Sequence, residues 1–114
     1  MLYIHVQDFL EKASRCQRLT RQEEILAATA MAQGDSQARQ RLIESYLPMA
    51  AGYVRRSNPR YRTLSLVYAC LQALEKEVDS FDFLQDREPF AHRLGWRLRR
   101  TVIEHLVNSR AAAN

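Results

Sequence analysis

The stretch LTRQEEILAATAMAQGDSQARQRLIE, residues 19–44, contains the start and stop signals of two consecutive helices. Thr20, followed three residues later by Glu23, is a capping box, in which each side chain satisfies a backbone N–H of the first helical turn. Gly34 is typical of the left-handed residue that ends a helix, and Asp35 is a good cap for the next one. The inward row of that second helix is predicted to be Ala38, Leu42 and Ile43.

Helical spacing continues on both sides of this stretch. Residues 6 to about 16 predict a short amphipathic helix. Pro48 predicts a kink or a restart, with a helix over about 48–56, because proline is tolerated in a first turn but not in a helix interior. The Asn58-Pro59 pair favours a loop over 57–62. Long helices are predicted over about 64–79 and 90–108, and residues 109–114 are predicted to form a frayed tail. The apolar face of the 64–79 helix is predicted to comprise Leu64, Val67, Tyr68, Leu71, Leu74 and Val78.

Composition supports a helical protein with one core. The chain has 114 residues, of which 46% are hydrophobic, and it contains only three Gly and three Pro. That length suits a single domain over residues 1–114. Few helix breakers favour helix, and no window alternates apolar and polar residues over a strand length. The sequence therefore predicts an all-α fold, a compact multi-helix bundle.

The net charge indicates the class of partner, and the cysteines indicate the cellular compartment. The formal net charge is +4 and the isoelectric point is about 9.4, which favours polyanionic partners. Cys16 and Cys70 have no metal-ligand spacing, as expected in a reducing compartment. No apolar run approaches the roughly 20 residues that span a bilayer. We therefore expect a cytoplasmic protein without a membrane partner.

The last predicted helix, FAHRLGWRLRRTVIEHLV at residues 90–107, has two distinct faces. Its core arc is predicted to comprise Phe90, Leu94, Leu98, Val102 and Leu106. Arg93, Arg97 and Arg100 group on another arc, with Trp96 beside them. Guanidinium groups bridge phosphates and an indole stacks on an unpaired base, so this face predicts nucleic-acid contact. The alternative is that Trp96 lies at the rim of the core and the arginines only solvate a face.

A second basic cluster surrounds the Asn58-Pro59 loop. Its members are Arg55, Arg56, Arg60 and Arg62, with no acidic residue between the first and the last. A solvated loop would have the same composition. Two arginine clusters in one small chain nevertheless favour a polyanion-binding surface.

The order of these segments resembles the bacterial sigma-70 family of RNA polymerase sigma factors. Residues 19–24 (LTRQEE), 33–35 (QGD) and 38–44 (ARQRLIE) are similar to the pattern that joins family regions 1.2 and 2.1, and residues 46–50 (YLPMA) continue it. The segment from Leu64 to Asp82, ending in Phe-Asp, resembles region 2.2. The segment from Phe90 to Val102 resembles regions 2.3 and 2.4. The likeness spans roughly residues 5–108.

The resemblance implies a sigma-like bundle with two partners. In the family, region 2.2 docks on the clamp coiled coil of the largest subunit of core RNA polymerase, and regions 2.3 and 2.4 read promoter DNA at the −10 element. The polymerase-binding residues would then be Ser65, Tyr68, Gln72, Glu75 and Lys76. The DNA-binding residues would be Arg55, Arg56, Arg60, Arg62, Arg93, Trp96, Arg97 and Arg100.

The chain also departs from the family pattern. The Gln that reads a base in the family is matched here by Arg100, and one of the family's promoter-binding aromatic residues is matched by Arg93. These changes favour contact with the DNA backbone over readout of bases. No region 3 or region 4 segment follows, so a second protein would have to supply the region 4-like reader of a −35 element. The competing interpretation is a degenerate sigma-like interaction module or regulator without specific DNA binding.

An enzyme is the third and least favoured class. His5, His92 and His105 lack the spacing of a zinc site. Glu75 and Glu77 are two residues apart on a predicted helix and so point to different faces. No glycine-rich phosphate loop is present. We therefore expect no catalytic activity, no metal and no cofactor.

Overall fold

Two capped helices form one end of the molecule, as the start and stop signals predict. The structure is a computed structural model that describes residues 3–85 and 87–113. At α2 (Arg21–Ala32), the Thr20 N–H donates to Glu23 Oε1 at 2.9 Å and the Glu23 N–H donates to Thr20 Oγ1 at 3.1 Å. Gly34 adopts a φ of +97°. Asp35 Oδ1 then accepts two backbone N–H groups at the start of α3 (Ser36–Ser45).

The remaining elements are helical as well. They are α1 (Val6–Ser14), α4 (Leu47–Arg56), a 3₁₀ turn at Pro59–Tyr61, α5 (Leu64–Ser80) and α6 (Phe90–Ala113). No strand occurs in the described part of the chain. The prediction of an all-α, multi-helix bundle is confirmed.

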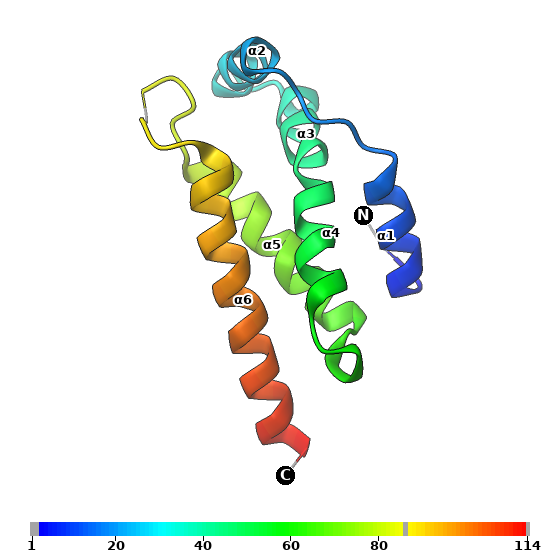
Figure 1. The fold of residues 1–114 in the computed structure, drawn as a ribbon. Helices are drawn as coiled ribbons and strands as arrows, with labels where there is room; N and C mark the ends of the chain where they lie inside the picture. The colour runs from blue at the N-terminus through cyan, green and yellow to red at the C-terminus, as the bar shows by residue number, and fades with distance from the viewer. Residues whose placement is uncertain (1–2, 86, 114) are drawn as a thin grey trace.

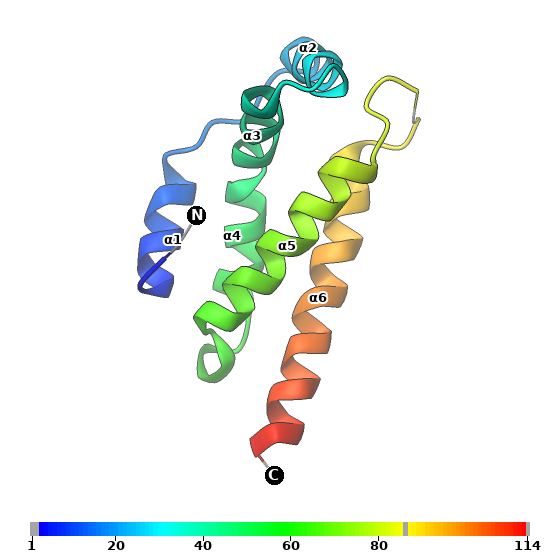
Figure 2. The same cartoon turned by 180° about the vertical axis from the view of Figure 1, so that it is seen from behind.

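The helices lie in a row with α2 across one end (Figure 1). α3 and α4 follow one another almost in line, α5 returns beside them, and α6 runs in the same direction as α4. α1 packs on α4 and α5, while α6 packs on the other side of these two helices (Figure 2). Among the described residues, no helix combines the length and the apolarity that crossing a bilayer requires.

The core runs along α4 and α5. Its largest fully buried side chains are Phe9, Leu42, Leu47, Leu66, Leu74, Leu94 and Leu98. The predicted apolar face of α5 is partly wrong, because Leu64, Tyr68 and Leu71 are only half-buried. The buried row instead includes Leu66, Cys70 and Ala73. α5 packs against several other helices. Small side chains in its buried row allow those helices to approach closely, whereas the predicted row contains larger side chains.

Two predicted helix ends are also corrected. α1 ends at Ser14, before Cys16. α6 continues to Ala113, so the tail predicted for 109–114 is helical over 109–113, while residue 114 lies outside the described residues. The last turns contain no glycine or proline, and alanine has the highest helix propensity, so nothing stops the helix at Asn108.

A buried polar contact holds α2 against the junction of α3 and α4. The Tyr46 hydroxyl donates to Glu24 Oε2 at 2.8 Å, and both residues are at least nine-tenths buried. Burial, followed by the neighbouring Glu24 carboxylate, raises the pKa of Tyr46 far above its ordinary value. Tyr46 also contacts Phe90 edge-on, with ring centroids 4.7 Å apart. The start of α6 is thereby tied to the first half of the chain.

Candidate nucleic-acid interface

Core packing of α6 sets the direction in which Trp96 points. Phe90, Leu94 and Leu98 are buried, and Phe90 joins Phe81 and Phe83 in a cluster of rings. With that face turned inward, Trp96 lies on the outer part of the helix and leaves 62% of its surface exposed. The prediction that this indole faces solvent is confirmed.

Trp96 lines a groove of about 300 Å³ between α4 and α6. The other residues of this α4–α6 groove are Met49, Tyr53, Ala91, His92, Gly95 and Arg99. Gly95 lies against side chains of α4, because a Cβ atom there would lie 3.3 Å from both Met49 Cε and Tyr53 Oη. The absence of a side chain at Gly95 therefore keeps the groove open beside the two aromatic rings.

A short polar chain orients the indole. Trp96 Nε1 donates a long hydrogen bond to His92 Nε2 at 3.4 Å, and His92 Nδ1 lies 2.7 Å from Glu88 Oε1. Both ring nitrogens of His92 are thus engaged, one by Glu88 and the other by the indole. The rings of His92 and Trp96 meet edge-on at 6.4 Å. His92 and Trp96 lie one turn apart on α6, and Glu88 precedes the helix by two residues.

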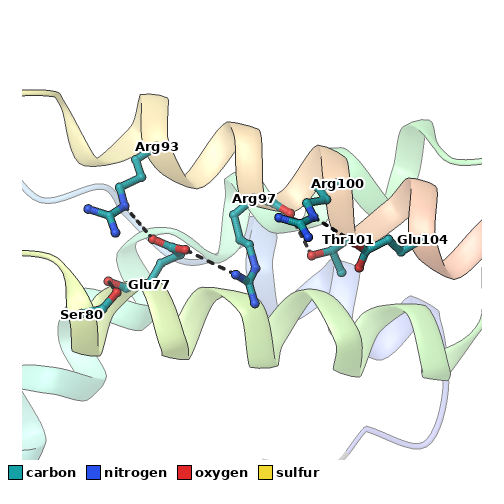
Figure 3. A network of polar contacts seen from close by, with 7 residues as sticks. All are labelled: Glu77, Ser80, Arg93, Arg97, Arg100, Thr101 and Glu104. Atoms are coloured by element: carbon teal, nitrogen blue, oxygen red, sulfur yellow. Dashed lines mark hydrogen bonds and ion pairs between the residues drawn. The ribbon is translucent and has the colours of Figure 1, made fainter.

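Arg93 and Arg97 turn toward Glu77 on α5 (Figure 3). Neither lines the groove of Trp96, so the prediction that these two arginines share the face of the indole is wrong. Glu77 Oε2 lies 3.1 Å from Arg93 Nε, and Glu77 Oε1 lies 3.9 Å from an Arg97 terminal nitrogen. The contact with Arg93 is an ion pair without hydrogen-bond geometry, so Glu77 Oε2 accepts no hydrogen bond. Both arginine side chains keep about 40% of their surface exposed, at 42% and 39%. Their charge is thus partly neutralised by one carboxylate on α5.

Arg100 is more exposed and has a weaker partner. Its Nε lies 2.9 Å from Glu104 Oε1 one turn further along α6, and 75% of its side chain is accessible. An exposed pair at this spacing contributes about 0.3–0.5 kcal/mol. A phosphate could therefore replace the Glu104 carboxylate at small cost.

The four arginines of the loop cluster have different surroundings. Arg62 donates to the backbone carbonyls of Arg55 and Ser57, so it closes the carboxyl end of α4. Arg60 stacks over Tyr61 with its guanidinium carbon 5.6 Å from the ring centroid. Arg56 lies over Tyr53 at 4.9 Å, while Arg55 is exposed.

The structure brings one member of the loop cluster toward the last helix. Arg56 covers Tyr53, and Tyr53 lines the same groove as Trp96 and Arg99. Sequence reasoning missed Tyr53, His92 and Arg99. The signal for Tyr53 was its spacing from Arg56, but its nearness to Trp96 depends on α4 and α6 lying side by side in the same direction.

The predicted polymerase-binding residues divide between two surfaces. Ser65, Tyr68, Gln72 and Glu75 line a groove of about 580 Å³ between α5 and α3, which we call the α3–α5 groove. Tyr3 covers part of it, because its backbone N–H donates to the Tyr68 hydroxyl at 2.7 Å. Lys76 instead lies with Arg97 and Glu104 along the seam between α5 and α6.

Comparisons with known proteins identify no family for this chain. No protein-family model and no curated protein sequence matches this chain. Within the described residues, no group of three or more His, Cys, Asp or Glu side chains is placed to hold a metal ion.

Proposed function

We propose that the chain is a sigma-70-like transcription initiation factor or co-sigma protein that binds core RNA polymerase and promoter DNA near the −10 element. The observation that carries this proposal is the exposed Trp96 in a groove that also contains Tyr53 and Arg99. The order of sequence segments that resembles the family supports the same function. A role on polymerase would place the protein in the bacterial cytoplasm.

In this proposal the α4–α6 groove receives an unstacked base of single-stranded promoter DNA. Trp96 and Tyr53 offer aromatic surfaces, and stacking contributes on the order of 1–3 kcal/mol per base. Arg99 and Arg56 supply positive charge beside the rings, where phosphates of the same strand would pass. Arg100 is a third exposed cation, outside the groove and on the other side of Trp96 around α6.

The polymerase clamp coiled coil would contact the α3–α5 groove. Ser65, Gln72 and Glu75 supply hydrogen-bonding groups there, while Tyr68 and Leu71 supply apolar area. Such a mixture suits a specific interface, in which polar groups set the register and buried rings contribute most of the affinity.

Two measurements test the proposal. Core RNA polymerase should be captured by the immobilised chain at low salt. Binding to single-stranded DNA should weaken steeply with salt and should fall at least about tenfold in Trp96→Ala. Leu84→Ala is a matched control, because Leu84 is also exposed, at 56%, but lies outside the groove. Absence of polymerase capture at low salt would remove the proposal.

A degenerate sigma-like interaction module without specific DNA binding is the second candidate. The observation that favours it is that Arg93, Arg97 and Arg100 each lie against a carboxylate. In that case DNA binding would be equally weak in the native chain, Trp96→Ala and Arg99→Ala, while capture of a protein partner would persist.

A further inference from the structure

Three large apolar side chains form an exposed row on α6. Trp96, Ile103 and Val107 have 62%, 50% and 59% of their surface accessible. At about 100° per residue their positions fall within about 40° of one another around the helix axis. Leu94 and Leu98 lie well away from this row and are buried in the core. The row is therefore a second apolar face that the fold does not use.

DNA contact does not account for the whole row. A base stacks on the Trp96 ring, but the aliphatic Ile103 and Val107 offer no such surface. Exposed apolar residues scattered singly are ordinary, whereas an aligned set marks an interaction surface. From Trp96 to Val107 the row is about 16 Å long, which equals roughly three helical turns.

Positive charge lies on both edges of the row. By helical position, Arg99 and Arg110 lie along one edge and Arg100 along the other. Glu104, the acid between Trp96 and Val107, lies 2.9 Å from Arg100 in an exposed pair, which a carboxylate of the partner would displace at small cost before Arg100 contributes its charge. An apolar seam between basic edges is complementary to an apolar seam between acidic edges, as in helix pairs whose flanking charges select the partner.

We propose that this face of α6 is a docking surface for an acidic amphipathic helix of another protein. Ile103 and Val107 would pack in the seam, and the three arginines would pair with flanking Glu or Asp side chains. A second copy of the chain fits less well, because it would bring six of these arginines together with only two Glu104 carboxylates. The inference goes beyond the proposed function, since Ile103 and Val107 take no part in the DNA contact.

The test uses the full chain and a synthetic helical peptide of about three heptads with leucine in the seam and glutamate on both edges. Two control peptides carry lysine in place of glutamate, or the same acidic composition in scrambled order. Trp96 is the only tryptophan, so its emission reports occupancy directly. We expect the acidic amphipathic peptide alone to bind and to shift the emission to shorter wavelength.

The double variant Ile103→Gln/Val107→Gln should weaken this binding at least about tenfold, because it removes most of the apolar area of the seam. Both sites are exposed, so helicity measured by circular dichroism should stay unchanged. Leu26→Gln/Leu84→Gln is the matched control, with exposures of 65% and 56% outside α6, and should bind like the native chain.

Three outcomes would overturn the proposal. One is equal binding of the scrambled or lysine peptide. Another is a native dimer in sedimentation that the Ile103/Val107 double variant converts to monomer, which assigns the face to a second copy. The third is a double variant that loses single-stranded DNA binding but keeps peptide binding. Polymerase capture tests the proposed function separately, so failure of one proposal does not imply failure of the other.

Discussion

Glu77 lies on α5 between Arg93 and Arg97 and leaves only 8% of its surface exposed. This one carboxylate restrains two arginines that the sequence analysis predicts to contact DNA. Glu77 also links α5 to α6 beside the core, so it affects both the stability of the fold and the positive charge that the surface presents. A substitution that removes only its charge measures these two effects separately.

We expect Glu77→Gln to increase DNA affinity while it lowers stability. Arg93 and Arg97 would become available to phosphates. The affinity for single-stranded DNA should therefore fall more steeply with salt, by an amount that corresponds to about one to two additional phosphate contacts. Loss of the half-exposed ion pairs should cost about 1–2 kcal/mol in urea unfolding. Glu75→Gln makes the same change in net charge in the α3–α5 groove. Equal DNA binding by the two variants would contradict the restraint.

His92 contacts the indole of Trp96 from the preceding turn. Its Nε2 lies 3.4 Å from the indole nitrogen, and its Nδ1 lies 2.7 Å from Glu88 Oε1. Tyr53 and Arg99 line the same groove. Removing the imidazole should therefore change the surroundings of the indole.

His92→Ala should shift the tryptophan emission, because it removes the ring that meets the indole edge-on at 6.4 Å. His105→Ala should leave the emission unchanged, because His105 lies in the seam between α5 and α6 and does not line the groove of Trp96. An emission of His92→Ala identical to that of the native chain would show that His92 does not restrain the indole.

At the scale of elements, Arg39 on α3 and Asp79 near the end of α5 form a two-pronged contact at 2.7 and 3.0 Å. The Arg39 guanidinium holds the pKa of Asp79 below its ordinary value. A lowered folded-state pKa contributes stability above the unfolded pKa, near 3.9, and that contribution is lost as pH falls through the folded value. Half of Asp79 is exposed, so the contribution is screened.

Asp79→Asn should destabilise the protein by about 0.5–1 kcal/mol near neutral pH, measured by urea unfolding. The difference from the native chain should shrink once pH falls below about 4. A double-mutant cycle with Arg39→Gln isolates the pair, since each change should cost little when the partner is already absent. A difference that persists undiminished at the lowest pH would rule out this linkage.

Elements defined by local signals could be predicted from the sequence, and contacts between elements could not. Thr20, Gly34 and Asp35 act on their own turns, so their helix ends are confirmed. The buried face of α5 depends on which helices flank it, so helical spacing alone wrongly predicts that the half-buried Tyr68 belongs to the core row. At the site, helical spacing predicted the exposure of Trp96. The partner of Arg93 and Arg97 lies on another helix, where spacing within α6 gives no information.

For the molecule as a whole, the two grooves are separate surfaces. The α3–α5 groove and the α4–α6 groove have no lining residue in common and are formed by different helix pairs. A protein that joins polymerase to DNA needs two faces that can be occupied at once. The proposed function therefore requires that each face can be disabled without the other.

Gln72→Ala/Glu75→Ala should reduce polymerase capture while leaving single-stranded DNA binding within about twofold, because both side chains are exposed and neither lines the groove of Trp96. Trp96→Ala should do the reverse. In a mixture of polymerase and labelled DNA, only the native chain should recruit both, and each variant should lose one partner. If both variants lost both partners together, the two grooves would act as one surface, and a bridge between polymerase and promoter could not be built on this bundle.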